Sequence, residues 1–369
     1  MPIVAVIPKP NAPVELRDIS LPELEPNSGL LDVKLSEVCG TDVYLQQGGL
    51  DNVPYPLIPG HVSVGHLSKI RGQLRDVEGK PFREGDQVTF LDVHRTCNAC
   101  WYCLVAKATT RCPQRKVYGI TYGLDDGLCG GWAEQIYIKP GTHCIRLNGN
   151  PETFMAGGCA LPTALHAVER GEINLGDTVL VLGSGPVGIS AIILALMRGA
   201  LRVLCIGAPA LRLEAATRAG ASAVANIETF TEQQRLEWVL AETGGRGADV
   251  TIEATGSPAA VVQAMRFTRD AGRVVIVGQY TDHGPVPIEA AFNPHFDLNR
   301  KHLDVRGCWG SDFSHFYRAA QIIGDESRAA PWARISLARY NLGQANEALA
   351  DVSAGRVLKA LIDPVSVAE

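Results

Sequence analysis

Residues 178–199 read TVLVLGSGPVGISAIILALMRG: a short apolar run, a glycine-rich turn and a longer apolar run. The first run has the length and β-branched content of a buried strand. The second is typical of a buried helix that begins at Pro186, since proline is favoured in the first helical turn. Between them, Gly183, Gly185 and Gly188 have the spacing G-x-G-x-x-G. Placed between a strand and a helix, this spacing predicts a turn that binds the pyrophosphate of a dinucleotide.

Each glycine of this turn has its own expected role. Gly183 permits the tight turn, Gly185 lets the backbone approach the pyrophosphate, and Gly188 lets the helix lie close to its strand. The alternative is an ordinary strand-to-helix turn, which the setting makes the weaker interpretation. The neighbouring residues of the turn are also expected to contact the cofactor: Ser184, Pro186 and Val187.

Strand-like and helix-like segments alternate on the C-terminal side of this turn. Strands are predicted at 202–207, 222–227, 249–255 and 273–278, and helices at 210–220, 231–243 and 258–269. Such alternation is typical of an α/β fold with a doubly wound parallel Rossmann sheet covered by helices on both faces. We assign residues 156–300 to this dinucleotide-binding domain.

A second domain is expected because 369 residues are too many for one comfortable core. Residues 1–155 contain short β-rich segments separated by Gly, Pro and Asp, with strands expected at 30–38, 63–70, 86–93 and 132–139. Residues 301–369 end in the strand-like run AGRVLKALIDP, which we expect to rejoin the first domain.

Composition and charge exclude several classes of function. The chain is 46% apolar and 20% charged, as in ordinary globular proteins, and its net charge of −5 offers no basic patch for nucleic acid. The longest apolar run, ISAIILALM, has nine residues and is too short to cross a bilayer. The N-terminus lacks the charged segment of a signal peptide. We therefore expect a cytoplasmic protein that acts on a small molecule, with neither nucleic acid nor a membrane as partner.

Four of the ten cysteines fall in the stretch CNACWYCLVAKATTRC at 97–112. Disulfides are not expected in a reducing compartment, and a redox pair needs only one C-x-x-C. Cys97, Cys100, Cys103 and Cys112 can instead supply four thiolates in a tetrahedron, which suits structural zinc; four reduced loop cysteines are the alternative. A closed four-sulfur site has no open position, so this lobe, about 95–115, is expected to hold a loop and to do no chemistry.

A second possible zinc site involves residues far apart in the sequence. Cys39 lies in CGTD, His61 in PGHVSVGH and Cys159 in GGCALPTALHAV. One histidine and two cysteines make a three-ligand zinc site with a fourth position free. From the residues alone this set is a guess, since lone cysteines and histidines are more often core or surface residues.

The order of motifs along nearly the whole chain resembles the zinc-dependent medium-chain alcohol dehydrogenase family. The matching stretches are CGTD, PGHVSVGH, GDQV, CxxCxxC…C, GGWAEQI, CALPTALHA, GSGPVG, EATG and RVVIVG. The resemblance implies a β-rich GroES-like catalytic domain beside the Rossmann domain. It also implies hydride transfer between an alcohol or carbonyl substrate and NAD or NADP, and two zinc ions per chain.

Carried over residue by residue, the resemblance assigns Cys39, His61 and Cys159 to the catalytic zinc and the four cysteines from Cys97 to the structural zinc. It assigns Thr41 to passing the substrate proton toward the cofactor ribose, and Asp42 to orienting the zinc-bound imidazole. Further cofactor contacts are expected from Gly207, Arg212, Thr255, Gly278 and Lys359.

The sequence departs from the family pattern at three places. Val62 replaces a glutamate that many relatives carry after the zinc-binding histidine. Tyr44 replaces a relay histidine, and its phenol is a poorer base at neutral pH. Eight residues separate Cys103 from Cys112, one more than the usual seven.

The strand after 202–207 leaves the choice of cofactor open. It ends at Gly207 without the acidic residue that would bind a ribose diol, and Arg212 could meet a 2′-phosphate or face solvent.

The expected substrate is a hydrophobic primary or secondary alcohol. Candidate pocket residues are mainly apolar and include no cluster of Arg or Lys: Tyr44, Val93, His94, Phe292 and Trp309. A polyol or sugar dehydrogenase of the same family is the first alternative, and a non-enzymatic zinc- or nucleotide-binding regulator is the second. By resemblance we expect a homodimer or homotetramer.

Overall fold

The structure is a computed structural model, and it describes residues 1–279 and 292–365. The chain divides into two compact units. Unit 1 comprises Met1–Cys159 with Asp312–Glu369, and unit 2 comprises Ala160–Ser311. Among the described residues, the helices are all too short or too polar to cross a membrane.

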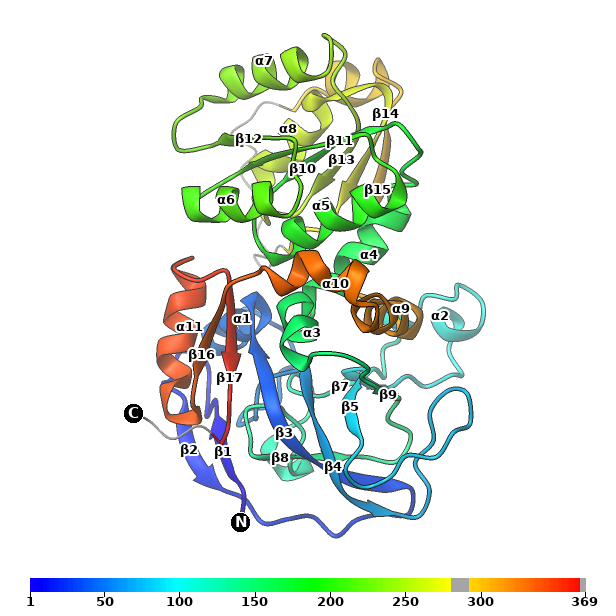
Figure 1. The fold of residues 1–369 in the computed structure, drawn as a ribbon, viewed down its shortest axis with the longest axis vertical. Helices are drawn as coiled ribbons and strands as arrows, with labels where there is room; N and C mark the ends of the chain where they lie inside the picture. The colour runs from blue at the N-terminus through cyan, green and yellow to red at the C-terminus, as the bar shows by residue number, and fades with distance from the viewer. Residues whose placement is uncertain (280–291, 366–369) are drawn as a thin grey trace. The chain divides into compact units, whose positions relative to one another are not determined.

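Unit 2 contains a six-stranded sheet in which every neighbouring pair is parallel (Figure 1). Its strands lie in the order β12-β11-β10-β13-β14-β15. Counted from β10, this is the order 3-2-1-4-5-6 of a Rossmann sheet, so the predicted fold class is confirmed. The strands are β10 (Thr178–Leu182), β11 (Arg202–Gly207), β12 (Ala223–Asn226), β13 (Ala248–Glu253), β14 (Thr268–Ile276) and β15 (Asp304–Gly307).

Helices cover both faces of this sheet. One group packs side by side against one face, and a second pair packs against the other (Figure 1). The first group is α4 (Ala160–Arg170), α5 (Pro186–Arg198) and α6 (Ala210–Arg218); the pair is α7 (Glu232–Glu242) and α8 (Pro258–Phe267). A π-helical turn, Pro294–Asn299, precedes β15. Because helices cover both faces, strands such as β10 and β13 are almost wholly buried, which explains their continuous apolar runs.

Unit 1 is built on a seven-stranded sheet that joins distant parts of the chain. Its order is β16-β17-β3-β4-β5-β9, with β8 paired to β3. The C-terminal strand β17 is antiparallel to β3, so residues near both ends of the chain are neighbours in one sheet. The strands are β3 (Ser28–Val38), β4 (Ser63–Arg71), β5 (Gln87–Phe90), β8 (Gln135–Ile138), β9 (Cys144–Arg146), β16 (Leu337–Tyr340) and β17 (Lys359–Ile362).

Smaller elements surround this sheet. Two hairpins are formed by β1 (Ile3–Val6) with β2 (Glu15–Asp18), and by β6 (Val93–Arg95) with β7 (Lys116–Val117). The helices are α1 (Gly40–Gln47), α2 (Trp101–Leu104), α3 (Pro151–Gly157), α9 (Phe313–Gly324), α10 (Glu326–Ala333) and α11 (Ala345–Ser353). Single 3-10 turns lie at η1 (Thr109–Arg111), η2 (Leu124–Asp126) and η4 (Leu342–Gln344).

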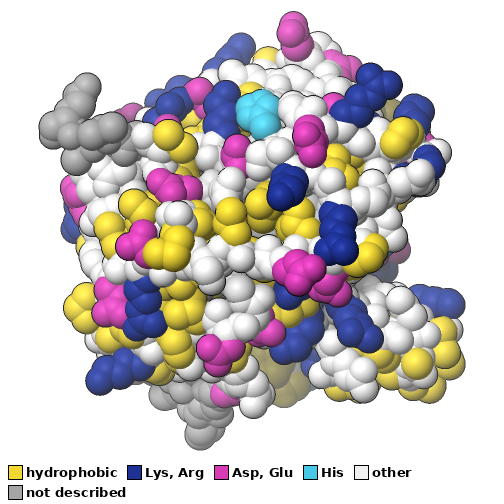
Figure 2. Space-filling model, turned by 90° about the horizontal axis from the view of Figure 1, so that it is seen from below, with side chains coloured by type: hydrophobic (Ala, Val, Ile, Leu, Met, Phe, Trp, Pro, Cys, Tyr) yellow, Lys and Arg dark blue, Asp and Glu magenta, His cyan; other side chains and the backbone are white. Residues whose placement is uncertain are grey.

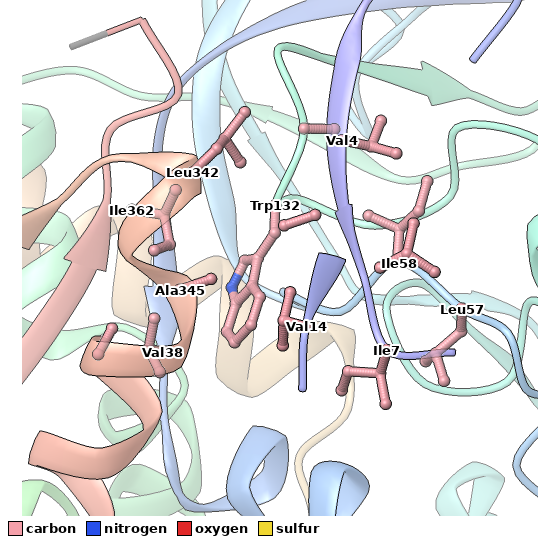
Figure 3. Close-up of a cluster of buried hydrophobic side chains, with 14 of the residues drawn as sticks. Val4, Ile7, Val14, Val38, Leu57, Ile58, Trp132, Leu342, Ala345 and Ile362 are labelled. Carbon is pink, nitrogen blue, oxygen red and sulfur yellow. The ribbon is translucent and has the colours of Figure 1, made fainter. Parts of the chain in front are cut away.

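The core of unit 1 gathers around Trp132 (Figure 3). Its indole is fully buried and donates its N–H to the carbonyl oxygen of Glu37 at 2.9 Å. Val38, at the end of β3, packs in the same cluster. The end of β3, which leads directly into Cys39, is therefore held by a large buried side chain.

The expected strand 86–93 is wrong in one respect. The chain forms two strands there, β5 in the large sheet and β6 in a hairpin. Between them, the Asp92 side chain accepts a hydrogen bond from the Val93 N–H at 2.9 Å. Such a local side-chain bond competes with a continuous ladder and allows the chain to change sheets.

Charged side chains of both signs are interspersed over the described part of the face seen in Figure 2. This mixture agrees with the small net charge of −5. A face of this kind produces no strong field of one sign.

Candidate active site

Cys39, His61 and Cys159 are brought together within unit 1. Their candidate ligand atoms all lie within 4.8 Å of one another, and Cys39 Sγ lies 3.9 Å from His61 Nε2. Ideal tetrahedral zinc with ordinary Zn–S and Zn–N bonds separates sulfur from nitrogen by about 3.5 Å. The three residues therefore fit one zinc ion, and as a set of two thiolates and one imidazole they leave its fourth position open.

Local structure explains how each ligand is presented. Cys39 is the N-cap residue of α1, directly after β3. His61 precedes β4, and Cys159 follows α3. Since β3 and β4 are paired as far as Ser36 and Ser63, the sheet brings Cys39 and His61 together across 22 residues of sequence.

Asp42 lies fully buried beneath this trio. Its carboxylate accepts hydrogen bonds from the N–H groups of Cys39 at 2.8 Å and Gly60 at 3.3 Å. One oxygen also lies 4.0 Å from His61 Nδ1, which is buried and has no hydrogen-bond partner among the described residues. With Nε2 directed to a metal, a small ring movement would let Nδ1–H donate to Asp42, which is the usual support for a zinc-bound imidazole.

The charges of the site favour a cation. A hydrogen bond from Cys159 holds the pKa of Cys39 well below its ordinary value, although burial opposes this shift. Burial would lower the pKa of His61, but the charge of Cys39, its hydrogen bond and the charge of Asp42 together raise that pKa to about 10. The site thus stabilises a positive charge beside a thiolate. A bound divalent cation would be stabilised by the same negative groups.

The four cysteines of the 97–112 lobe also converge. Their sulfur atoms lie within 4.8 Å of one another, and the Cys97 N–H lies 3.3 Å from Cys112 Sγ. The backbone N–H of Ala99 lowers the pKa of Cys97 to about 6, so this thiol ionises readily. The 3-10 turn η1 lies directly before Cys112. This set fits a closed structural zinc site.

The lobe has little apolar burial of its own. Trp101, Leu104 and Val105 are 62%, 53% and 63% exposed. A short loop that leaves its apolar side chains in water gains little from the hydrophobic effect, so the four thiolates and their metal must hold it.

The phosphate turn of unit 2 has the geometry that its glycines predict. Gly183 has φ +107°, and a Cβ atom at Gly188 would lie 1.9 Å from the Gly183 carbonyl oxygen. Gly185 is the N-cap of α5, and a Cβ atom there would meet nothing within 4 Å. The open space at Gly185, next to the N–H groups of the first turn of α5, fits a pyrophosphate.

The other expected cofactor residues of unit 2 lie at the carboxyl ends of neighbouring parallel strands. Gly207 ends β11 so close to the phosphate turn that a Cβ atom would lie 2.3 Å from Ser184 Oγ. Thr255 follows β13 and donates from its N–H and Oγ1 to the buried Glu253 carboxylate at 2.6 and 2.5 Å. Gly278 follows β14, and its N–H donates to the Glu253 carbonyl oxygen. Ligands of doubly wound sheets bind at this edge. The prediction that Gly207, Thr255 and Gly278 contact the cofactor therefore agrees with their positions and stays a prediction.

Lys359 was expected to contact the cofactor, and in the structure it contacts buried groups of unit 1. It belongs to unit 1, where its ammonium contacts the Glu37 carboxylate and lies 3.5 Å from the Gly157 carbonyl oxygen. Burial would lower the pKa of Lys359, but the negative charge of Glu37 raises it. Its contact with a cofactor stays a prediction.

The expected pocket residues are divided between the two units, and their contact with a substrate stays a prediction. Val93 and His94 are in unit 1, and both ring nitrogens of His94 are engaged, with Tyr122 Oη at 2.5 Å and the Pro140 carbonyl oxygen at 3.0 Å. Phe292 packs against the core of unit 2. Trp309 is also in unit 2 and is half exposed. His94 and Phe292 are therefore committed to contacts within their own units.

On α1, Thr41 and Tyr44 are both half-buried residues that follow Cys39 within the first turns. Their roles with a substrate stay predictions.

Glu37, which was not predicted, is a further residue of this site. Its carboxylate accepts a hydrogen bond from the Cys159 N–H at 2.7 Å. The only sequence signal was a glutamate inside a strand that is otherwise largely apolar near its end, two positions before a ligand.

The chain is similar to proteins of one enzyme family. Residues 186–325 match the zinc-binding dehydrogenase family, and residues 25–149 match the alcohol dehydrogenase GroES-like domain. A 5-exo-hydroxycamphor dehydrogenase of Pseudomonas putida is 31% identical over 354 residues, which cover 95% of each chain. Sorbitol and erythritol/L-threitol dehydrogenases are also among the relatives.

Solved structures agree with this similarity. An alcohol dehydrogenase of Thermotoga maritima superimposes with a TM-score of 0.91 at 29% identity, covering 98% of this chain and 99% of its own. A structure from Sinorhizobium meliloti 1021, described as a zinc-binding dehydrogenase bound to NADP, has a TM-score of 0.81 at 26% identity. It covers 99% of this chain and 100% of its own.

Proposed function

Since the chain belongs to the zinc-dependent medium-chain alcohol dehydrogenase family and is an NAD(P)-dependent oxidoreductase, we propose that it oxidises a hydrophobic alcohol, or reduces the corresponding carbonyl compound. The observation that carries this proposal is the three-ligand site of Cys39, His61 and Cys159. Three ligands hold a metal and leave one position for substrate, which a purely structural zinc site does not.

Zinc bound there supplies a Lewis acid for the substrate oxygen, and NAD(P) supplies the hydride acceptor. The chain's own residues then do the rest. Cys39, His61 and Cys159 fix the ion, and Asp42 orients the His61 ring. The phosphate turn aligns the dinucleotide. Thr41 Oγ1 is proposed to accept the substrate proton and pass it on.

The proton path proposed here differs from that of relatives with a relay histidine. Tyr44 stands at that position, and a phenol is a poor base at neutral pH. We propose that the proton leaves from Thr41 through the cofactor ribose or water. In this path, the side chain at position 44 does not need to act as a base.

Two observations favour a hydrophobic alcohol over a polyol. The relative named for a hydroxylated camphor is the more similar, at 31% identity against 27% for the sorbitol dehydrogenase. Both carboxylates beside the metal ligands have other partners: Glu37 contacts Lys359 and the Cys159 N–H, and Asp42 accepts from the N–H groups of Cys39 and Gly60. Neither is therefore available for substrate hydroxyl groups.

Turnover measurements test the substrate class directly. We expect cyclic and other hydrophobic secondary alcohols to give a kcat/KM at least about tenfold above those of sorbitol and erythritol, since each buried CH₂ contributes about 0.8 kcal/mol. The assay follows cofactor absorbance in both reaction directions with matched alcohols and ketones. A higher kcat/KM for sorbitol would replace this proposal with the polyol alternative. No turnover by a wild-type protein that holds a single zinc ion would favour the non-enzymatic regulator.

We also propose that NADP is the preferred cofactor. β11 ends at Gly207, followed by Ala208 and Pro209, so no carboxylate is there to repel a 2′-phosphate. Arg212 lies in the first turn of α6, and its Nε is buried without a hydrogen-bond partner among the described residues. A half-buried guanidinium whose Nε has no partner among the described residues is better suited to bind a phosphate than to face solvent.

Replacing Arg212 with alanine tests this preference by binding. We expect the dissociation constant of NADPH to rise about 10- to 100-fold and that of NADH to change less than about twofold, because only the former carries the charged partner. Fluorescence titration of the two reduced cofactors gives both constants. Arg218→Ala is the matched control, since Arg218 is on the same helix and pairs with Glu214 at 3.8 Å. Equal losses for the two cofactors would contradict the proposal.

Cytoplasmic location and assembly as a homodimer or homotetramer remain proposals. In support of a reducing compartment, none of the ten cysteines, all of which the structure describes, forms a disulfide. The assembly is inferred from the family resemblance alone.

A further inference from the structure

A fully buried ion pair lies beside the candidate zinc ligands, although neither of its members is a ligand. The pair consists of Glu37, near the end of β3, and Lys359, the first residue of β17. The side chains of both residues are only 1% exposed, and the Lys359 ammonium contacts Glu37 Oε1. Adjacent strands bring them together across 322 residues of sequence.

Both oxygen atoms of the Glu37 carboxylate also contact Cys159. Oε2 accepts a hydrogen bond from the Cys159 N–H at 2.7 Å, and Oε1 lies 3.3 Å from Cys159 Sγ. The contact with Oε1 needs the S–H of Cys159, which a metal-bound thiolate lacks, so the carboxylate holds the third ligand through its backbone N–H. Lys359 occupies the remaining side of Oε1.

The backbone of Glu37 is tied to the other two ligands. Its N–H donates to the carbonyl oxygen of Val62 at 3.0 Å, and Val62 directly follows His61. Glu37 itself lies two residues before Cys39. One residue thus connects the segments that carry all three ligands.

Gly158 packs closely against the ion pair. Gly158 has φ +49°, and a Cβ atom there would lie 2.2 Å from Glu37 Oε2 and 2.5 Å from Lys359 Nζ. A side chain at position 158 would displace one of these charged groups, so glycine suits this position. The loop before Cys159 is therefore shaped to lie directly on these two charges.

Stability alone does not account for this arrangement. Taking two charges out of water is costly, and replacing a buried ion pair by apolar residues of similar size is often neutral or stabilising. An unpaired carboxylate would also be unfavourable here, since two thiolates already offset the charge of a zinc ion and a third negative group would repel them. Lys359 removes that repulsion while leaving Glu37 in place.

We propose that Glu37 and Lys359 are positioning residues for the catalytic metal: Glu37 holds Cys159 in place for coordination, and Lys359 neutralises Glu37 so that it can lie beside two thiolates. This inference rests on the zinc site of the proposed function. The pair does not contact the substrate, and its effect is on how firmly and in what geometry the metal is held.

The test uses the full-length zinc-loaded protein and the double variant Glu37→Met/Lys359→Met, which keeps the approximate size of both side chains and removes both charges and the acceptor for the Cys159 N–H. We expect the rate of release of the catalytic zinc to a chelator to rise about 10- to 100-fold, as for other outer partners of metal ligands. The cobalt-substituted protein should show a changed visible absorption of its cobalt–thiolate bonds. The melting temperature should change little, and the structural zinc should remain.

A second variant covers the case in which the double variant does not fold. Glu37→Asp keeps the charge for Lys359 but shortens the side chain, so the contact with the Cys159 N–H is lost. It should release the catalytic zinc faster than wild type while keeping the ion pair. The control is Arg146→Met, which breaks a pair with Asp76 elsewhere in unit 1 and should leave zinc release unchanged.

Unchanged zinc release and an unchanged cobalt spectrum in both variants would overturn the inference and leave the pair a structural element only. A lowered melting temperature with normal zinc release would do the same. Failure of the proposed function has a different signature. In that case the wild-type protein itself would hold a single zinc ion, whichever residue stands at position 37.

Discussion

The Cys39→Ala protein is expected to hold one zinc ion per chain instead of two and to lose activity by about 10³-fold or more. Cys39 supplies one of only three protein ligands, and two ligands do not hold zinc firmly in an open site. The metal contributes several kcal/mol to stabilising the charge that develops on the substrate oxygen, and each 1.36 kcal/mol corresponds to a tenfold change in rate. Metal analysis and kcat/KM measured on the same preparation give both results.

The matched control for this experiment is Cys144→Ala. Cys144 is also a buried cysteine of unit 1, but it belongs to an apolar cluster and to neither group of candidate ligands. It should keep two zinc ions and nearly full activity. An active Cys39→Ala protein with both ions would show that the catalytic metal is not held by this trio. A wild-type protein with one zinc, which Cys39→Ala retains, would favour the non-enzymatic regulator.

The second large effect is expected in the four-cysteine lobe. Cys103→Ala should remove the structural zinc, lower the melting temperature by about 5 °C or more, and expose the lobe to proteolysis before the rest of the chain. The reason is that the lobe leaves Trp101, Leu104 and Val105 in water and has no core that could keep it folded without metal. The catalytic zinc should remain, because its ligands form a separate group.

Thermal unfolding, metal analysis and limited proteolysis measure these outcomes. Cys129→Ala is the control, since Cys129 is equally buried in unit 1 and lies outside both groups of ligands. It should keep both zinc ions and show no early cleavage within residues 97–112. If Cys103→Ala also kept two ions and an unchanged melting temperature, the four sulfurs would not be a metal site.

The phosphate turn and the alternation around it could be predicted because their signals are local. The tight turn requires glycine at position 183, and the close approach of the helix requires glycine at position 188. Both positions lie within one strand–turn–helix unit. The predicted helices agree with the observed ones to within a few residues, since each depends mainly on its own apolar periodicity. The expected strand 86–93 was wrong because the chain changes sheets within it, at the point where the Asp92 carboxylate accepts a hydrogen bond from the Val93 N–H.

Of the two groups of metal ligands, the sequence alone indicated only one. The four-cysteine lobe was recognisable from spacing alone, because its ligands lie within sixteen residues. Cys39, His61 and Cys159 were not, and only resemblance to a family brought them together before the structure did. A glutamate in a largely apolar strand end was the only signal for Glu37, and it did not reveal the role, which comes from contact with Cys159 and with Lys359, 322 residues away.

From its residues alone, the sequence determined that this chain has a dinucleotide-binding Rossmann fold and a compact four-sulfur lobe, because both depend on residues that are close together along the chain. Only the tertiary structure decided which carboxylate lies against the third ligand and what Lys359 contacts. Those contacts exist because the sheet of unit 1 pairs β17 with β3, and strand pairing over such separations leaves no periodic trace in a single sequence.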